Sequence, residues 1–70
     1  MRCIISYTHP RNGSTYYFVD FRSVDGTLVP VGVFPCRRNN ATVFETKRFA
    51  NSVVKYLKSF GCSYCKIHPI

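Results

Sequence analysis

The sequence predicts an α+β fold, in which a three-stranded antiparallel meander is followed by one amphipathic helix packed on one face and a short C-terminal strand (β-β-β-α-β). Two turn signals, Asn12-Gly13 and Asp25-Gly26, separate three stretches rich in β-branched and aromatic residues. One later stretch, residues 46–61, has apolar residues at the period of a helix. No repeat or linker divides the 70 residues, so we expect residues 1–70 to form a single small domain.

The first two strands are expected over residues 2–9 and 15–24, joined by a turn that contains Asn-Gly. In the second strand, alternation of side chains places Tyr17, Val19 and Phe21 toward the helix. The opposite face of that strand is expected to carry Tyr16, Phe18, Asp20 and Arg22.

The third strand is expected over residues 27–34, with Val29, Val31 and Val33 on its inner face. Pro30 lacks a backbone donor, which places this strand at the edge of the sheet or beside a bulge. Residues 35–40 are then expected to form an exposed basic connection, and residues 41–45 a short extended piece.

The helix is predicted over residues 46–61, with Thr46 as its N-cap and Gly61 as its C-cap. A capping box formed by Thr42 and Glu45 would instead begin the helix earlier. The stripe expected to face the core, with Tyr56 at its margin, contains Phe49, Ala50, Val53, Val54, Leu57 and Phe60.

Residues 62–67 have the β character of a last strand. Because a helix precedes this strand, we expect it to run parallel to its neighbour through a right-handed connection. We place it beside the first strand, which predicts the sheet order 3-2-1-4.

Ten Lys and Arg residues against three acids give the chain a net charge of +7, which attracts anions. The expected partners are DNA, RNA or an acidic host protein surface. No apolar run approaches the roughly 18 residues of a membrane span, so no membrane partner is expected. The first apolar run is broken at Ser6, which is not typical of a signal peptide, and we expect a cytoplasmic protein.

The residues do not indicate an enzyme, because three acids are too few for a persuasive catalytic pair and His9 and His68 lack a neighbouring nucleophile. No cofactor is expected. The alternative is a zinc site on Cys62 and Cys65, with Cys3, Cys36, His9 or His68 completing the ligands. The simpler interpretation treats Cys65 and Cys3 as small, reduced core residues.

The outward side of the predicted helix carries basic residues without a compensating acid, which favours contact with phosphates or carboxylates. Two arginines of the basic connection and one of the second strand extend this set. The predicted binding residues are Arg22, Arg37, Arg38, Lys47, Arg48, Lys55 and Lys58.

The sheet face that the helix leaves open is expected to be apolar and aromatic, interleaved with arginine. Such a face can stack single-stranded nucleic acid, or it can dock a protein or a second copy in a homodimer. The predicted sheet-face contacts are Tyr16, Phe18 and Phe34, with Ile4 and Leu28 beside them.

Two resemblances bear on function. Residues 16–60, with YYFVDFRSVDGTLVPVGVF and FETKRFA, resemble the three strands and helix of AP2-type and phage-integrase arm-type DNA-binding domains. That resemblance implies a sheet that enters the major groove, with Arg22 at a contact position. The VFET run before the helix and the ending Lys66-Ile67-His68-Pro69 resemble small phage-encoded β-β-α-β proteins, among them T7-type inhibitors of host RNA polymerase.

The leading hypothesis is a non-enzymatic basic module that binds a polyanionic partner, with nucleic acid placed first. The alternative hypothesis is a small phage or viral accessory protein. Such a protein would bind and inhibit a host protein, for example RNA polymerase or another nucleic-acid-handling enzyme, in the host cytoplasm.

Overall fold

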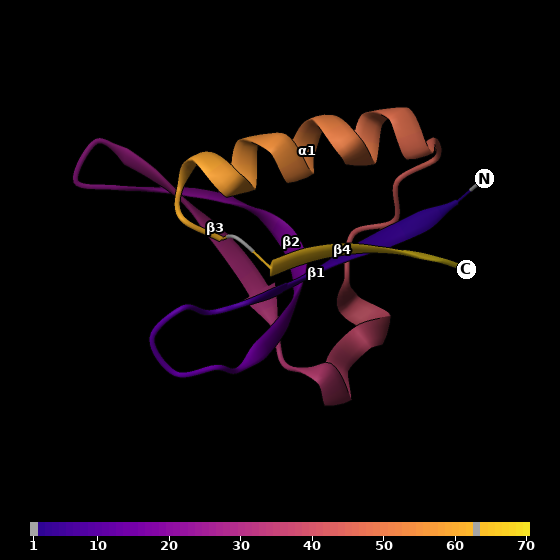
Figure 1. Ribbon diagram of the computed structural model, residues 1–70, viewed down its shortest axis with the longest axis horizontal. Coiled ribbons are helices and arrows are strands. Elements are labelled where there is room, and N and C mark those ends of the chain that lie inside the picture. The colour runs from indigo at the N-terminus through magenta and orange to yellow at the C-terminus, as the bar shows by residue number, and fades with distance from the viewer. Residues whose placement is uncertain (1, 63) are drawn as a thin grey trace.

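The computed structural model describes residues 2–62 and 64–70, without the side chains of Pro35 and Cys36 (Figure 1). Within this part of the chain there is one four-stranded antiparallel sheet with one α-helix, so the predicted α+β class is confirmed. In chain order the elements are β1 (Cys3–Thr8), β2 (Thr15–Val24), β3 (Thr27–Val33), the 3₁₀-helix η1 (Pro35–Asn40), α1 (Lys47–Ser59) and β4 (Tyr64–Pro69).

The strands lie in the order β3-β2-β1-β4, which confirms the predicted neighbours of the last strand. Its predicted direction is wrong, because β4 runs antiparallel to β1, with Ile5 opposite Ile67. The prediction required the helix to return the chain along the sheet. Instead η1 and residues 41–46 make that return, and Phe44 reaches Cys3 at the start of β1. The helix then runs back alongside β1, and β4 runs the opposite way. Ser63 of the predicted strand lies outside the described residues.

α1 begins directly after Thr46, which is the N-cap residue that the sequence predicts. Its hydroxyl accepts a hydrogen bond from the backbone N–H of Phe49 at 3.2 Å, and this satisfies one of the unpaired donors of the first turn. The earlier start at Thr42 is not adopted, because the Thr42 hydroxyl donates to the backbone carbonyl of Val19 in β2.

The end of α1 is a Schellman motif. Gly61 has φ of +87°, a left-handed conformation that glycine adopts without a Cβ clash. Its N–H donates to the carbonyl of Lys58 at 3.0 Å, and the N–H of Cys62 donates to the carbonyl of Leu57 at 3.2 Å. Leu57 and Cys62 both belong to the core cluster, which gives the apolar contact typical of this motif. The predicted C-terminal glycine is confirmed.

The core lies between α1 and the adjacent face of the sheet, which we term the inner face. Its centre is β1, where Ile5 is fully buried against Leu57 and Ala50 of the helix. Only part of the predicted helical stripe reaches this core. Phe49 and Phe60 are exposed, because α1 packs on β1 and β4 and leaves its flank toward β2 uncovered.

A β-bulge in β2 reverses the predicted faces of that strand's first half. The pairing with β3 shifts between Phe18 and Asp20, so Val19 is an extra residue. The shift brings Phe18 and Phe21, which are three residues apart, to the same core. Tyr17 therefore points to the opposite side of the sheet from the one predicted.

Strand β3 also presents the other face from the one predicted. A Cβ at Gly32 would lie 2.8 Å from Tyr16 Cβ, which places Gly32 on the inner side. The valines alternate with it, so Val29, Val31 and Val33 lie on the opposite side, half-buried. The edge position predicted from Pro30 is confirmed, since β3 is an outermost strand.

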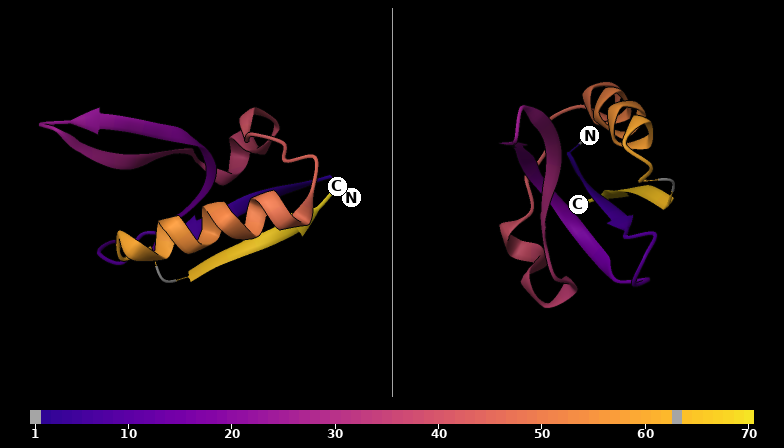
Figure 2. Two further views of the ribbon diagram at one scale, coloured as in Figure 1. Left: turned by 90° about the horizontal axis from the view of Figure 1, so that it is seen from above. Right: turned by 90° about the vertical axis from the view of Figure 1, so that its left-hand side faces the viewer.

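Residues 41–44 form the predicted extended piece and fill a fork between β1 and β2. These two strands pair only near Ser6 to Thr8 and then diverge. On one side of the fork, Thr42 N–H donates to the carbonyl of Phe18 at 3.0 Å. On the other, Phe44 and Cys3 exchange two backbone hydrogen bonds of 2.8 and 3.0 Å. The β2–β3 hairpin consequently diverges from the helix toward its tip (Figure 2).

Candidate nucleic-acid interface

The surface that best fits a nucleic-acid partner is the side of the sheet opposite α1, which we term the outer face. Figures 1 and 2 show α1 and η1 on opposite sides of the sheet. Because side chains alternate along a strand, residues paired across β2, β1 and β4 share a face. The outer face comprises Ser6, Thr8, Thr15, Tyr17, Tyr64, Lys66 and His68, joined by Arg38 from η1.

Three flat groups cross this face in a row. The guanidinium carbon of Arg38 lies 5.6 Å from the ring centroid of Tyr17, a cation-π distance. The Tyr17 and His68 ring centroids are 6.1 Å apart. His68 Nε2 lies 2.7 Å from Ser6 Oγ, in a hydrogen bond whose direction depends on the histidine tautomer. Ser6 is buried, so this bond holds the imidazole in place from below.

Tyr64 and Lys66 continue the outer face to the free edge of β4. Tyr64 is 69% exposed, and Lys66 is exposed beside it. Of the three acids, Asp20 pairs with Val31 and therefore lies on the outer side of the β2–β3 hairpin, whereas Asp25 lies in the hairpin turn and Glu45 just before α1. The part of the outer face formed by β1, β4 and the start of β2 combines one exposed ring and two half-buried rings with cations, and Asp20 lies further along β2.

The seven predicted basic residues do not form one surface. All are exposed, but they divide between the two sides of the sheet and the hairpin. Arg38 belongs to the outer face, and Arg22, which pairs with Val29, lies on the same side of the sheet as predicted, further along the β2–β3 hairpin. Arg37 precedes Arg38 in η1. The helix basic group, on the other side of the sheet, consists of Lys47, Arg48, Lys55 and Lys58.

The predicted sheet-face contacts need correction. Phe18 is only 4% exposed and belongs to the core, and Tyr16 lies on the inner side, between Tyr7 and Phe34 at 5.7 and 5.1 Å. Phe34 is exposed at the end of β3. Ile4 is buried rather than open, in a region that the η1 segment shares. The bulge and the position of η1 cause these differences, and neither is a local property of the sequence.

Sequence reasoning missed Tyr17, Tyr64, Lys66 and His68 as members of one surface. The face of Tyr17 was mispredicted because of the bulge in β2. The shared face of the other three could have been predicted, because they alternate in β4 with Cys65 and Ile67, which pack against the core. A period of two with aromatic and basic residues on one side indicates a strand with one open face.

The two thiols of the zinc alternative, those of Cys62 and Cys65, are buried and half-buried. Burial raises the pKa of the Cys65 thiol to about 11 and raises that of Cys62, so both thiols stay protonated at neutral pH. The Cys65 thiol donates to the carbonyl of Cys62 at 2.9 Å. Among the described residues no three potential ligands gather, since Cys3 lies at the other end of β1. The side chain of Cys36 lies outside the described part of the chain.

Neither helix in the described ranges, 2–62 and 64–70, is both long and apolar enough to cross a membrane. The chain was also compared with protein-family models, curated proteins and solved structures. It matches none of these.

Proposed function

We propose that the protein binds single-stranded nucleic acid on the outer face of its sheet. The observation that carries this proposal is the row formed by Arg38, Tyr17 and His68, with Tyr64 and Lys66 beside it. Rings on an open sheet accept unstacked bases on their faces, and neighbouring cations neutralise the phosphates. The net charge of +7 raises the encounter rate with any polyanion.

The arrangement favours single strands over a duplex. Bases in a duplex are stacked on one another, so their faces are unavailable to Tyr17 or Tyr64, whereas a single strand can splay its bases outward. Every base has a flat face of this kind, so stacking discriminates weakly between bases. We therefore expect modest sequence preference.

Replacement of Tyr64 by alanine tests the stacking contact. Loss of one stacked base costs about 1–3 kcal/mol of binding free energy, which corresponds to a dissociation constant roughly 5- to 150-fold larger. The measurement is fluorescence anisotropy with a labelled single-stranded oligothymidine at fixed salt. Because Tyr64 is largely exposed, its removal should leave the fold intact, which circular dichroism would verify.

The control is Phe34→Ala, since Phe34 is an aromatic residue that is 55% exposed and contacts Tyr16 on the inner side. We expect the affinity of this variant to stay within a factor of about two of the original, because it loses no stacked base. If Tyr64→Ala binds the oligonucleotide as tightly as the unaltered chain, or if the unaltered chain does not bind at low salt, the proposal is wrong.

A second candidate function is inhibition of a host protein that presents an acidic surface to the helix basic group. The observation that favours it is the first turn of α1, which contains Lys47 and Arg48 and no acid. The helix dipole favours anions at this end, so an acidic partner would relieve an unfavourable cluster. RNA polymerase and other nucleic-acid-handling enzymes are the host proteins that we propose to test.

The test is a pull-down from nuclease-treated bacterial lysate, with Lys47→Glu/Arg48→Glu as the matched variant. A stoichiometric protein band that survives nuclease and disappears with the variant would support this second function. Absence of any such band would exclude it while leaving the oligonucleotide result unaffected.

A further inference from the structure

Strand β4 is the outermost strand beside β1, and in the described part of the chain no strand pairs with its other edge (Figure 2). Two contacts near the end of β4 fix its hydrogen-bonding pattern. Both backbone groups of Cys3 bond to Phe44, so Cys3 is not bonded to Pro69, which lies opposite it. The N–H of Ile70 donates to the carbonyl of Arg2 at 3.0 Å. Pro69 therefore belongs to a non-bonded pair, and Ile70 belongs to a bonded one.

The same pattern shows which backbone groups form the free edge of β4. Bonded and non-bonded pairs alternate along an antiparallel ladder, so Lys66 and His68 bond to β1, whereas Cys65 and Ile67 do not. The N–H and C=O groups of Cys65 and Ile67 consequently point away from β1. The side chains of these two residues pack against the core. The free edge thus presents backbone donors and acceptors that an added strand could pair with.

The other edge of the sheet is less suited to a further strand. There the outermost strand is β3, and Pro30 in its middle has no N–H to donate. The proline of β4 is Pro69, which is the last residue of that strand. Of the two edges, the edge of β4 is therefore the one that can extend the sheet.

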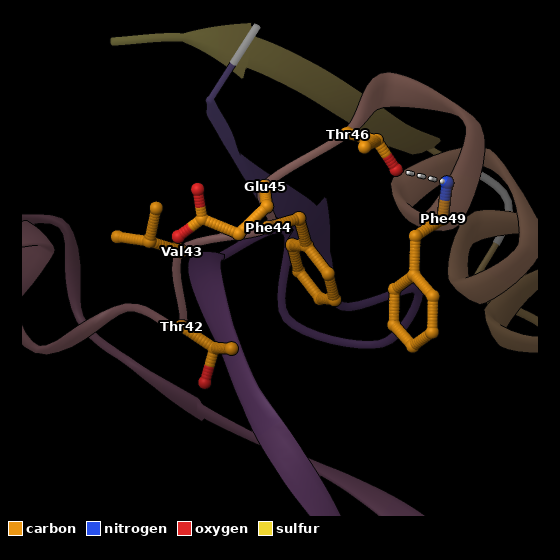
Figure 3. A pocket seen from close by; sticks show the side chains of 6 residues that line it. All are labelled: Thr42, Val43, Phe44, Glu45, Thr46 and Phe49. Carbon is orange, nitrogen blue, oxygen red and sulfur yellow. Dashed lines mark hydrogen bonds between the residues drawn. The ribbon is translucent and has the colours of Figure 1, made fainter.

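The flank of α1 that lies above β4 is basic, in contrast to its aromatic flank toward β2. Phe49, which Figure 3 shows at the start of the helix, lines a cavity with residues of β2, and Tyr56 and Phe60 contact a ring of β2. At 100° per residue, Lys58 lies about 160° around the helix from both Tyr56 and Phe60. Because β1 lies between β2 and β4, that opposite flank faces β4. Lys47 lies within about 20° of Lys58, about three turns earlier.

Cations therefore lie on both sides of the free edge. Lys58 is close enough to the edge for its charge to act on the Cys65 thiol, whose pKa is raised chiefly by burial and lowered in part by this ammonium group. On the outer side of the sheet, Lys66 is exposed in the middle of β4. The backbone donors and acceptors of the edge thus lie between a cation of the helix and a cation of the outer face.

We infer that the free edge of β4 binds an extended, acidic segment of a partner protein, which adds to the sheet as a further antiparallel strand. The backbone groups of the segment bond to those of Cys65 and Ile67. Its side chains alternate between the two sides of the sheet, where carboxylates lie near Lys66 and Lys58. The backbone supplies the affinity, and the cations select an acidic sequence.

A second copy of this chain and a nucleic acid both fit this edge less well. Pairing of two β4 edges would bring Lys58 and Lys66 of one copy toward the same residues of the other, and like charges across neighbouring strands are destabilising. A phosphate accepts from N–H groups but has no donor for the carbonyls of Cys65 and Ile67. The inference does not depend on nucleic-acid binding, and it rests on the second candidate function only in that both require an acidic partner.

The probe is a blocked, fluorescent peptide of about seven residues, a typical strand length, in which glutamate and valine alternate. Residues opposite Cys65 and Ile67 lie on the same face as these two, so the valines lie on the inner side and direct their N–H groups toward β4. N-methylation of the valines removes these donors and should weaken binding to the full chain about tenfold or more. N-methylation of the glutamates, whose N–H groups point away, is the control and should change the affinity less than about threefold.

Fluorescence anisotropy at low salt measures all three peptides. If the unmodified peptide does not bind, or if the two methylated peptides bind equally, the inference is wrong. These outcomes leave the oligothymidine result for Tyr64→Ala unaffected, so the inference and the proposed function fail separately.

A charge reversal tests the cation on the helix side of the edge. Lys58→Glu should weaken the unmodified peptide about fivefold or more, because a carboxylate then faces the acidic segment. The control is Arg22→Glu, which makes the same change of charge in β2, with β1 between it and β4. Its effect should stay within about twofold, since salt screens distant charges. Equal effects of the two variants would contradict binding at the edge of β4.

Discussion

The β1–β4 half of the sheet and the β2–β3 hairpin use similar residues in different ways. In β1, five consecutive residues from Cys3 to Tyr7 are buried, because α1 covers one side and the η1 segment adjoins the other. In β3, all of whose residues are described, none is buried. The side chains of β1 therefore lie at the centre of the core. The hairpin contributes Phe18 and Phe21 of β2 to that core, but β3 leaves its own surface open, and β2 presents Tyr17 on the outer face.

Two leucine truncations, one in the helix that covers β1 and one in the hairpin, give the largest contrast. Leu57→Ala removes a fully buried side chain from the core, which should lower the free energy of unfolding by about 2–5 kcal/mol. Leu28→Ala removes an exposed side chain from β3, and its effect should stay within about 0.5 kcal/mol. Urea denaturation monitored by circular dichroism measures both. Similar losses for the two variants would contradict the division into a covered half and an open hairpin.

Gly32 of β3 packs closely against Tyr16 of β2 and Tyr7 of β1. A Cβ there would lie 2.8 Å from both Tyr16 Cβ and the Tyr7 hydroxyl oxygen. Gly32→Ala should therefore cost about 1–3 kcal/mol through overpacking, although it lies in the open strand. Tyr7→Phe removes one of the two clashing atoms, so the double variant should lose less than the sum of the single losses. Urea denaturation of the three variants checks this, and full additivity would count against the clash.

The helix cap gives a smaller effect. Thr46→Ala removes the acceptor for the Phe49 N–H and should lower the free energy of unfolding by about 1 kcal/mol. The control is Ser52→Ala, in the exposed middle of the same helix, where alanine is at least as favourable. Thermal unfolding should show a lower melting temperature for the first variant only. Equal melting temperatures would mean that the cap contributes nothing.

The last expected effect is absent at neutral pH, because it is a loss of stability that appears only in alkali. Burial raises the pKa of Cys65 from 9.0 to about 11 and that of Tyr7 from 10.0 to about 12. Between the unfolded and folded values the unfolded chain releases its protons first, so the free energy of unfolding is fully retained below about pH 9 and falls above it. Cys65→Ser should flatten the first part of this decline in urea titrations at successive pH values. If Cys65→Ser leaves the pH dependence of the free energy of unfolding unchanged, other groups cause the decline in alkali.

Local features of the fold were predictable from the sequence. Asp25 and Gly26 both adopt positive φ, 51° and 79°, as expected of an Asp-Gly hairpin turn. Thr46 and Gly61 mark the ends of the helix for equally local reasons. The position of Pro30 on an outermost strand follows from its missing donor. Each of these depends on a few neighbouring residues, whose conformational preferences the rest of the chain does not override.

The site depends on features that are not local. The bulge at Val19 exchanges the faces of Tyr17 and Phe18, and alternation alone predicts neither its presence nor its position. The direction of β4 depends on the return of the chain through residues 35–46, which could not be read from helix length or turn residues. As a result, the basic residues were identified correctly as exposed, but their distribution over two sides of the sheet was not predicted.

The most direct test of the proposed function compares two lysines on opposite sides of the sheet. Lys66→Ala and Lys55→Ala remove the same charge, the first from the outer face and the second from the helix basic group. The slope of log affinity for oligothymidine against log salt concentration is negative. We predict that Lys66→Ala makes it less steep by about 0.7, the value for one phosphate contact on a single strand. Lys55→Ala should leave that slope unchanged. The reverse result, or equal slopes for both variants, would contradict binding on the outer face.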